Sequence, residues 1–349
     1  MVVIPSTFSI QNANKEVSGF LEEWYDDNDC VLVHTSGSTG VPKPMWIEKR
    51  RMLASARVTC DFLQLRAGHR ALLCLPLQFI AGKMMVVRAL ERQLCLLVVE
   101  PDGHPLASID CDNSENAIDF AAMVAMQGYN SLQVAEERRR LKSIRHLIIG
   151  GSAIDDGLAA ELRDFPNAVW STYGMTETLS HIALRRLNGE EASEWYTPLA
   201  DVSVSLNEEH CLVIHAPQVC DKTMMTNDIA ELASDGRRFR IIGRKDNVIC
   251  SGGIKLQIED IEKTLKSHMP VPFMVTKKKD VKYGEIVVLV YQNSDNGNGH
   301  LGEVIEQICQ SHLPKYWQPR RFLAVESLPV TANGKPARRQ AECLAAQMP

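Results

Sequence analysis

Glycines, hydroxyls and a lysine gather in one short stretch at positions 35–43, and these residue types suit the binding of an anion. Glycine frees the backbone, so consecutive N–H groups can line a concave cradle, while Lys43 adds a positive charge. We interpret the stretch as a loop that holds the β- and γ-phosphates of a nucleotide. The residues expected to contribute are Thr35, Ser36, Gly37, Ser38, Thr39, Gly40 and Lys43. The alternative is a solvated Gly/Ser loop between a strand and a helix, but the common P-loop is excluded because its two glycines stand farther apart.

A second group of chemically capable residues, at positions 173–178, reads Tyr-Gly-Met-Thr-Glu-Thr. The ring of Tyr173 can stack on a base, and the hydroxyl of Thr176 can bond a phosphate oxygen. The carboxylate of Glu177 can hold Mg²⁺, which prefers oxygen ligands together with substrate phosphates. Taken alone, the stretch is more typical of a capped helix start.

Two isolated residues could complete a nucleotide site. The carboxylate of Asp228 could accept hydrogen bonds from both hydroxyls of a ribose. Lys335 stands on an Asn-Gly turn, where it would present a point charge. Each has a plain alternative, because an aspartate or a lysine on a turn is usually only solvated.

These residues require a scaffold, and short apolar runs predict it. Strands are expected at 30–34, 71–75, 94–99, 147–149 and 168–170, with helices at 48–63, 80–90 and 158–162. Alternation of this kind predicts an α/β domain with a parallel sheet over roughly the first 170 residues. Ligands bind such sheets beyond the carboxyl ends of the strands. The loops 35–43, 150–154 and 172–178 are expected there.

The remaining segments have a different character. The stretch 117–141 is expected to be rich in helix, with its charge run at 136–140 forming a solvated face. Beyond Pro198, an antiparallel hairpin or a small barrel is expected over 202–214. A compact α+β unit follows, with helices at 258–265 and 304–312 and strands at 271–275, 286–291 and 322–325.

Composition excludes several classes of protein. The 349 residues are 45% hydrophobic and carry a net charge of −5, which argues for a globular protein and against a nucleic-acid binder. No apolar run is long enough for a membrane helix, and the start lacks the features of a secretory signal. The ten cysteines show no C-x-x-C spacing, so they indicate thiols in a reducing cytoplasm and not a metal site.

Together, these stretches resemble the motifs of the adenylate-forming superfamily, which comprises acyl- and aryl-CoA synthetases, adenylation domains of peptide synthetases, and luciferases. Residues 35–43 resemble its phosphate loop, 173–177 its Tyr-Gly-x-Thr-Glu motif, and 328–335 the motif that carries its catalytic lysine. The stretch 226–228 resembles Thr-Gly-Asp, with Asn227 in place of the glycine. The stretch 243–246 resembles the Gly-Arg-x-Asp hinge.

The resemblance implies the α/β adenylate-forming fold with two domains. A large N-terminal ATP- and acid-binding domain would cover residues 1–243, and a small mobile α+β domain would cover 244–349, with its hinge near Asp246. The stretches 251–255 and 259–262 resemble the start of that second domain, although Ile258 replaces a usual proline. The family usually has well over a hundred residues before the phosphate loop, and here there are 34, so an N-terminal subdomain is expected to be cut down.

The resemblance also implies a reaction and the roles of its residues. A small-molecule carboxylic acid would react with ATP·Mg²⁺ to give an acyl-AMP, which coenzyme A would then convert to a thioester. Lys335, Thr176 and Glu177 would be catalytic, with Glu177 also the metal ligand. Besides the phosphate loop, the nucleotide would contact a loop and four single residues: Gly151, Ser152, Ala153, Tyr173, Gly174, Asp228 and Arg244.

Residues 75–90 most resemble the o-succinylbenzoate–CoA ligases of menaquinone synthesis, in which an arginine follows a glycine by six residues. Phe79, which stands where a histidine is common, would line the acid site together with Gly82, Lys83 and Arg88. The free aromatic carboxylate of 2-succinylbenzoate calls for a cation, which Arg88 or Lys83 could supply. The alternative for Arg88 is a surface cap or ion pair. Another aryl- or acyl-CoA synthetase, or a non-catalytic nucleotide-binding relic of the fold, is the alternative for the protein. A homodimer is left open.

Overall fold

The computed structural model describes residues 8–34, 44–109, 116–151, 154, 156–293, 300–331 and 336–348. Its largest sheet has eight strands in the order β1-β5-β4-β6-β7-β8-β9-β10. The strands are β1 (Ser9–Gln11), β4 (Arg70–Leu73), β5 (Cys95–Val98), β6 (Phe120–Val124), β7 (His146–Gly150), β8 (Ala168–Gly174), β9 (His181–Arg186) and β10 (Thr197–Pro198). The pairings from β1 to β8 are parallel, and those of β9 with β8 and β10 are antiparallel. The predicted parallel sheet is confirmed.

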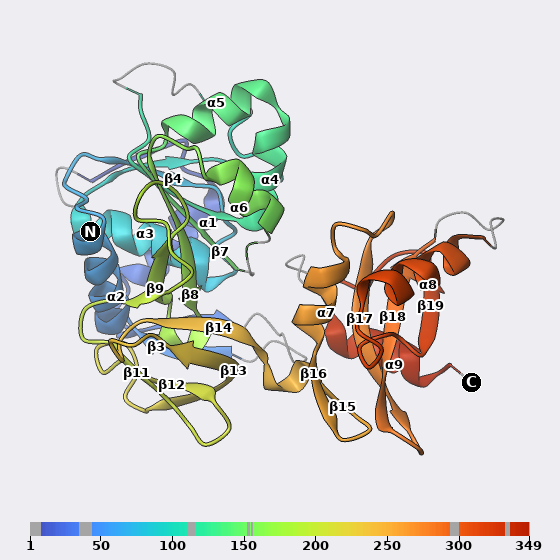
Figure 1. Ribbon diagram of the computed structural model, residues 1–349. Coiled ribbons are helices and arrows are strands. Elements are labelled where there is room, and N and C mark those ends of the chain that lie inside the picture. The colour runs from blue at the N-terminus through green and yellow to red at the C-terminus, as the bar shows by residue number, and fades with distance from the viewer. Residues whose placement is uncertain are drawn as a thin grey trace.

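Helices cover both faces of this sheet because successive strand residues point to opposite sides. In β4, Ala71 and Leu73 join one hydrophobic cluster, while Leu72 joins the other. The first cluster includes side chains of α1 (Lys15–Trp24), α2 (Lys49–Phe62) and α3 (Ile80–Arg92), and the second includes those of α4 (Ala125–Gln133), α5 (Ala135–Ser143) and α6 (Asp156–Leu162). Figure 1 shows α2 and α3 on one side of the sheet and α4 to α6 on the other.

Residues 30–34 form a strand as predicted, but not one of the large sheet. The strand β2 (Cys30–His34) pairs only with β3 (Pro44–Glu48), in antiparallel register, as a separate two-stranded sheet. Only Val31 and Val33 are buried in β2, so the apolar run is a half-buried edge and not a continuously buried strand. The predicted phosphate loop, 35–43, therefore connects two strands in the chain, not a strand and a helix, and lies outside the described residues.

Two further predictions hold only in part. The stretch 117–141 is rich in helix, as α4 and α5 show, but it begins with the strand β6, because a five-residue apolar run does not distinguish a buried strand from a helix. The charge run in α5 is not a wholly solvated face. Glu137 is 2% exposed, and its carboxylate bonds His104 Nδ1 at 2.8 Å and the Ser131 hydroxyl at 3.0 Å.

The second half of the chain forms two smaller sheets. The predicted hairpin is present as β11 (Ser203–Leu206) and β12 (Cys211–His215), which continue antiparallel into β13 (Met224–Leu232) and β14 (Phe239–Arg244). A short 3-10 turn, η2 (Lys245–Asn247), then leads into the C-terminal unit.

That unit is α+β, as predicted, and its described residues form a five-stranded sheet and three helices. Its elements are β15 (Val248–Ser251), β16 (Ile254–Gln257), α7 (Ile258–Leu265), β17 (Phe273–Asp280), β18 (Gly284–Gln292), α8 (His300–His312), β19 (Arg321–Val325) and α9 (Arg338–Ala346). Figure 1 shows it set beside the rest of the molecule and joined to it at the end of β14. The proposed boundary near residue 244 remains a prediction. Within the described residues, no helix is long and apolar enough to cross a membrane.

Candidate nucleotide and acid site

The carboxyl ends of β7 and β8 lie side by side and bring two predicted loops together. Ile149 pairs with Ser171, so the end of β7 adjoins Thr172 and Tyr173. A Cβ on Gly150 would lie 2.4 Å from the Thr172 hydroxyl, which only glycine avoids, and Gly151 has a φ of +85°. The predicted contacts Ser152 and Ala153 lie outside the described residues. Glycine at these two positions thus allows the close packing and the turn at the end of β7.

The turn after β8 holds Thr176 and Glu177 through backbone packing. Gly174 is required because a Cβ there would lie 2.3 Å from the Ser180 carbonyl oxygen. A 3-10 turn, η1 (Thr176–Thr178), follows, and the Thr178 hydroxyl accepts a hydrogen bond from the Met175 N–H at 3.0 Å. Thr176 is buried and Glu177 is exposed. Among the described residues nothing pairs with the Glu177 carboxylate, which fits an oxygen ligand for Mg²⁺.

Tyr173, Asp228 and Arg244 form a connected group between the large sheet and the β11–β14 sheet. Asp228 and Arg244 are direct partners in the register of β13 and β14, with Arg244 Nη1 3.3 Å from Asp228 Oδ1. The Tyr173 hydroxyl donates to Asp228 Oδ2 at 2.6 Å. Burial, and then the Asp228 charge, raise the pKa of Tyr173, so the phenol stays a hydrogen-bond donor. The structure therefore brings together three of the residues predicted to contact the nucleotide.

The predicted hinge residue has partners on the β13–β14 side. Asp246 accepts hydrogen bonds from Arg244 Nη2 at 3.1 Å and from the Asn227 amide at 3.2 Å. Neighbouring Lys245 donates to Glu209 Oε2 at 2.6 Å. The amide that replaces the family's glycine thus contacts the hinge carboxylate directly.

Three of the predicted acid-site residues lie at the start of α3. Phe79 is the N-cap of that helix. Gly82 has a packing reason, because a Cβ there would lie 2.3 Å from the Pro76 carbonyl oxygen. Lys83 is already engaged by α1, with Nζ 3.0 Å from Glu23 Oε2 and 4.7 Å from the centre of the Phe20 ring. Of the two cations considered, Lys83 is the one with a carboxylate partner.

Arg88 lies in the interior, so its interpretation as a surface residue is wrong. The side chain is 2% exposed, Nη2 donates to the Ser180 hydroxyl at 2.6 Å, and buried Nε has no partner. No carboxylate among the described residues pairs with it. Burial lowers the pKa of Arg88 to about 10, so the group is still charged at neutral pH. An unpaired buried cation is costly, and its position indicates a role other than stability.

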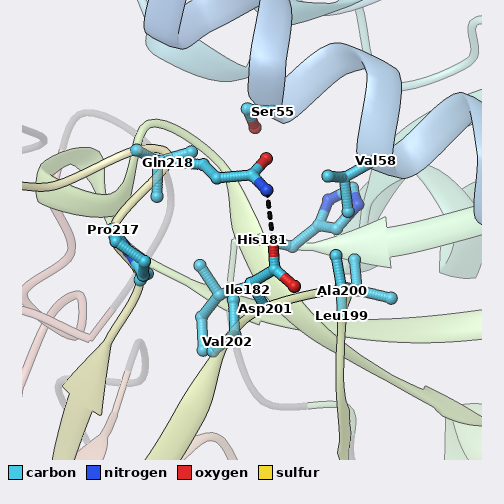
Figure 2. A pocket seen from close by; sticks show the side chains of 12 residues that line it. Ser55, Val58, His181, Ile182, Leu199, Ala200, Asp201, Val202, Pro217 and Gln218 are labelled. Carbon is cyan, nitrogen blue, oxygen red and sulfur yellow. Dashed lines mark hydrogen bonds between the residues drawn. The ribbon is translucent and has the colours of Figure 1, made fainter.

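Sequence reasoning missed the polar residues around Arg88. Ser180 lies two residues after the end of the Tyr-Gly-Met-Thr-Glu-Thr stretch. The residue between them, Leu179, has a φ of 65°, which is unusual for a residue with a side chain. His181 contacts Ser180 and, from the other ring nitrogen, the hydroxyl of Thr59 on α2. Figure 2 shows Ser55 and Val58 of α2 above His181 and Ile182 of β9 in a cavity that these residues line. The position of Ser180 beside a predicted site was the one available signal.

Comparison with known proteins shows the family of this chain. Residues 5–213 match the family described as AMP-binding enzyme. A solved structure from Dyadobacter fermentans, described as an acyl-CoA synthetase (AMP-forming)/AMP-acid ligase II-like protein, is 34% identical. Its TM-score is 0.63, and the match covers 94% of this chain and 93% of that one. The chain therefore belongs to the AMP-binding, adenylate-forming enzymes, as its motifs predicted.

Relatives with a named substrate are more distant. The 2-succinylbenzoate–CoA ligase of Bacillus cereus is 25% identical over 99% of this chain and 76% of that protein. The o-succinylbenzoate coenzyme A synthetase of Bacillus subtilis, solved with ATP and a magnesium ion, is 21% identical. Its TM-score is 0.70, and the match covers 88% of this chain and 69% of that one. At this identity the second likeness supports the fold alone, and the predicted fold is confirmed.

Proposed function

We propose that this protein is an AMP-forming acid–CoA ligase whose acid carries a second anionic group, with 2-succinylbenzoate as the substrate. The observation that carries the proposal is buried Arg88, which has a hydroxyl partner but no carboxylate partner among the described residues. A second carboxylate on the acid would supply the missing charge. The name of the Bacillus cereus relative supports the same choice.

The first step is attack by the acid's other carboxylate oxygen on the α-phosphorus of ATP. A new P–O bond forms and the bond to the bridging oxygen breaks, so acyl-AMP and pyrophosphate result. Lys335 and residues 35–43 would balance the charge on the reacting carboxylate and on the departing pyrophosphate. Thr176 would contact the α-phosphate, and Glu177 would hold Mg²⁺, which supplies further positive charge when bound. Positioning and charge neutralisation, not covalent catalysis, lower the barrier.

Asp228, Tyr173 and Arg244 would hold the nucleoside. The Asp228 carboxylate would accept hydrogen bonds from the ribose hydroxyls. Its contact with Arg244, at 3.3 Å, is long enough for the carboxylate to move slightly when the ribose binds. The shorter bond from Tyr173, 2.6 Å, would keep the carboxylate oriented. Gly151 and Gly174 would let the nucleotide approach the two strand ends closely.

In the second step the thiol sulfur of coenzyme A attacks the acyl carbon of acyl-AMP. The C–S bond forms, the bond from that carbon to the AMP oxygen breaks, and the thiol proton passes to solvent. A swing of the C-terminal unit about Asp246 would separate the two steps by withdrawing Lys335. The cysteines of the protein have no part in this chemistry.

A pyrophosphate-release assay with ATP and coenzyme A tests the proposal. Activity with 2-succinylbenzoate that exceeds activity with benzoylpropionate, the same keto acid without the ring carboxylate, is expected. Equal or greater turnover of mono-acids would contradict the proposed substrate. It would favour another acyl-CoA synthetase, the alternative to which the 34% identical Dyadobacter protein points. No release with any acid would indicate a nucleotide-binding relic.

A further inference from the structure

Arg88 is connected to helix α2 by a chain of buried hydrogen bonds whose direction can be worked out. The Thr59 hydroxyl donates to the Ser55 carbonyl oxygen at 3.2 Å, which uses its only proton. Thr59 Oγ1 must therefore accept at its other contact, 3.0 Å from His181 Nε2. The imidazole consequently carries its proton on Nε2.

The other half of the chain follows from this tautomer. With Nε2 protonated in a neutral imidazole, His181 Nδ1 can only accept, and it lies 3.3 Å from the Ser180 hydroxyl. Ser180 therefore donates to His181 and keeps its lone pairs for Arg88 Nη2, at 2.6 Å. The hydroxyls of Thr59 and Ser180 each donate one hydrogen bond and accept one, so the direction of every hydrogen bond in this series is fixed.

The environment favours this state of the chain. Thr59 and His181 are buried at 0% and 8% exposure. Burial, and then the Arg88 charge, hold the pKa of His181 well below its usual value, so the ring stays neutral. A charged ring would carry a proton on Nδ1 and could not accept from Ser180. The hydroxyl of Ser180 would then lose its fixed orientation.

We propose that Thr59 and His181 are specificity-positioning residues, which orient the Ser180 hydroxyl so that Arg88 is aimed at the second anionic group of the acid. The inference rests on the proposed function, because it assigns these residues to the receptor for that group. Neither residue would touch the reacting carboxylate. Their effect should therefore fall on the choice of acid and not on the chemistry of adenylation.

The test compares Thr59→Val, which removes the hydroxyl at nearly constant volume, with Thr59→Ser, which keeps it. KM and kcat are measured for 2-succinylbenzoate and benzoylpropionate, with KM for ATP and the melting temperature alongside. Thr59→Val should raise KM for 2-succinylbenzoate by about tenfold, the effect of one disturbed buried hydrogen bond. KM for benzoylpropionate and for ATP should not change, and Thr59→Ser should behave as the unaltered protein.

His181→Gln provides a second route, in case the valine variant fails to fold. Glutamine can still donate towards Thr59 but offers no acceptor at the place of Nδ1, so the same selective loss is expected. Preserved discrimination in both variants would overturn the inference and leave the proposed function standing. An equal rise in KM for both acids would show a merely structural role and also overturn it. If the unaltered protein does not distinguish the two acids, the proposed function fails first and the inference fails with it.

Discussion

Replacing Arg88 by methionine should separate stability from activity. The lowering of the Arg88 pKa to about 10 corresponds to a penalty of about 3 kcal/mol on the charged form in the folded state. At neutral pH the guanidinium is charged in both folded and unfolded chains, so the penalty is fully present. It would decline only as the pH rises above about 10, towards the higher pKa that the group has in the unfolded chain.

Arg88→Met removes this penalty, which stabilises the folded state, but it also removes interactions that nearly balance that gain. Arg88→Met removes the charge-assisted hydrogen bond to Ser180, which is worth about 1.5–3 kcal/mol. Methionine fills much of the volume, and exchange of buried charged groups for apolar ones is often neutral or stabilising. The free energy of unfolding should therefore stay the same or rise by about 1 kcal/mol, as measured by urea denaturation.

The activity of Arg88→Met with 2-succinylbenzoate should fall, although its stability does not. Loss of the cation that we propose binds the second carboxylate should cost about 3 kcal/mol, or roughly 100-fold in kcat/KM for 2-succinylbenzoate, with little change for benzoylpropionate. Arg92→Met on the same helix is the matched control, because Arg92 pairs with Asp61 at the surface and should not affect the choice of acid. Destabilisation of Arg88→Met by several kcal/mol, or an unchanged ratio between the acids, would refute the reasoning.

Four other changes test separate parts of the site. Lys335→Ala should abolish pyrophosphate release yet leave thioester formation from supplied acyl-AMP, and equal loss of both half-reactions would contradict its role. Asp246→Pro should do the reverse and accumulate acyl-AMP, whereas normal thioester turnover would count against the hinge. Gly174→Ala should cost about 1–3 kcal/mol in urea denaturation, since its Cβ would lie 2.3 Å from the Ser180 carbonyl oxygen, and a neutral result would remove the packing reason. Burial and then neighbouring charge lower the pKa of His146 to about 4. The free energy of unfolding should therefore fall by about 1–2 kcal/mol as the pH drops from 6.5 towards 4. His146→Gln should make the free energy of unfolding less dependent on pH in this range.

Most of the residues proposed to contact the nucleotide could be predicted from the local sequence. Tyr173 and Gly174 are recognisable because strand, turn and chemistry adjoin in a few residues, and the structure shows why Gly174 must be glycine. The alternation of apolar runs and helical spacing likewise predicted the parallel sheet. What failed was the distinction between a strand and a helix in the apolar run of β6, where periodicity carries no information.

The acid side could not be predicted in the same way, since it depends on burial and on contacts between distant residues. Arg88 is separated from Ser180 by 92 positions, and Thr59 from His181 by 122. An arginine in a helix is usually solvated, and although apolar residues on both sides of Arg88 favour a buried helix, they do not identify Ser180 as its partner. Glu137 was misjudged for the same reason, because its partners His104 and Ser131 become neighbours only in the folded chain.

The contact of Gly82 with the Pro76 carbonyl oxygen also fixes a length. Helix α3 is held at its first turn, where even one methyl group would collide with the backbone. Arg88 lies six residues farther along, about 9 Å up the helix axis at 1.5 Å per residue. The distance along the helix axis between the first turn of α3, next to the end of β4, and Arg88 is therefore fixed. If Arg88 binds the acid as proposed, a longer or shorter acid would have to be accommodated by residues 176–181, because the first turn of α3 cannot shift.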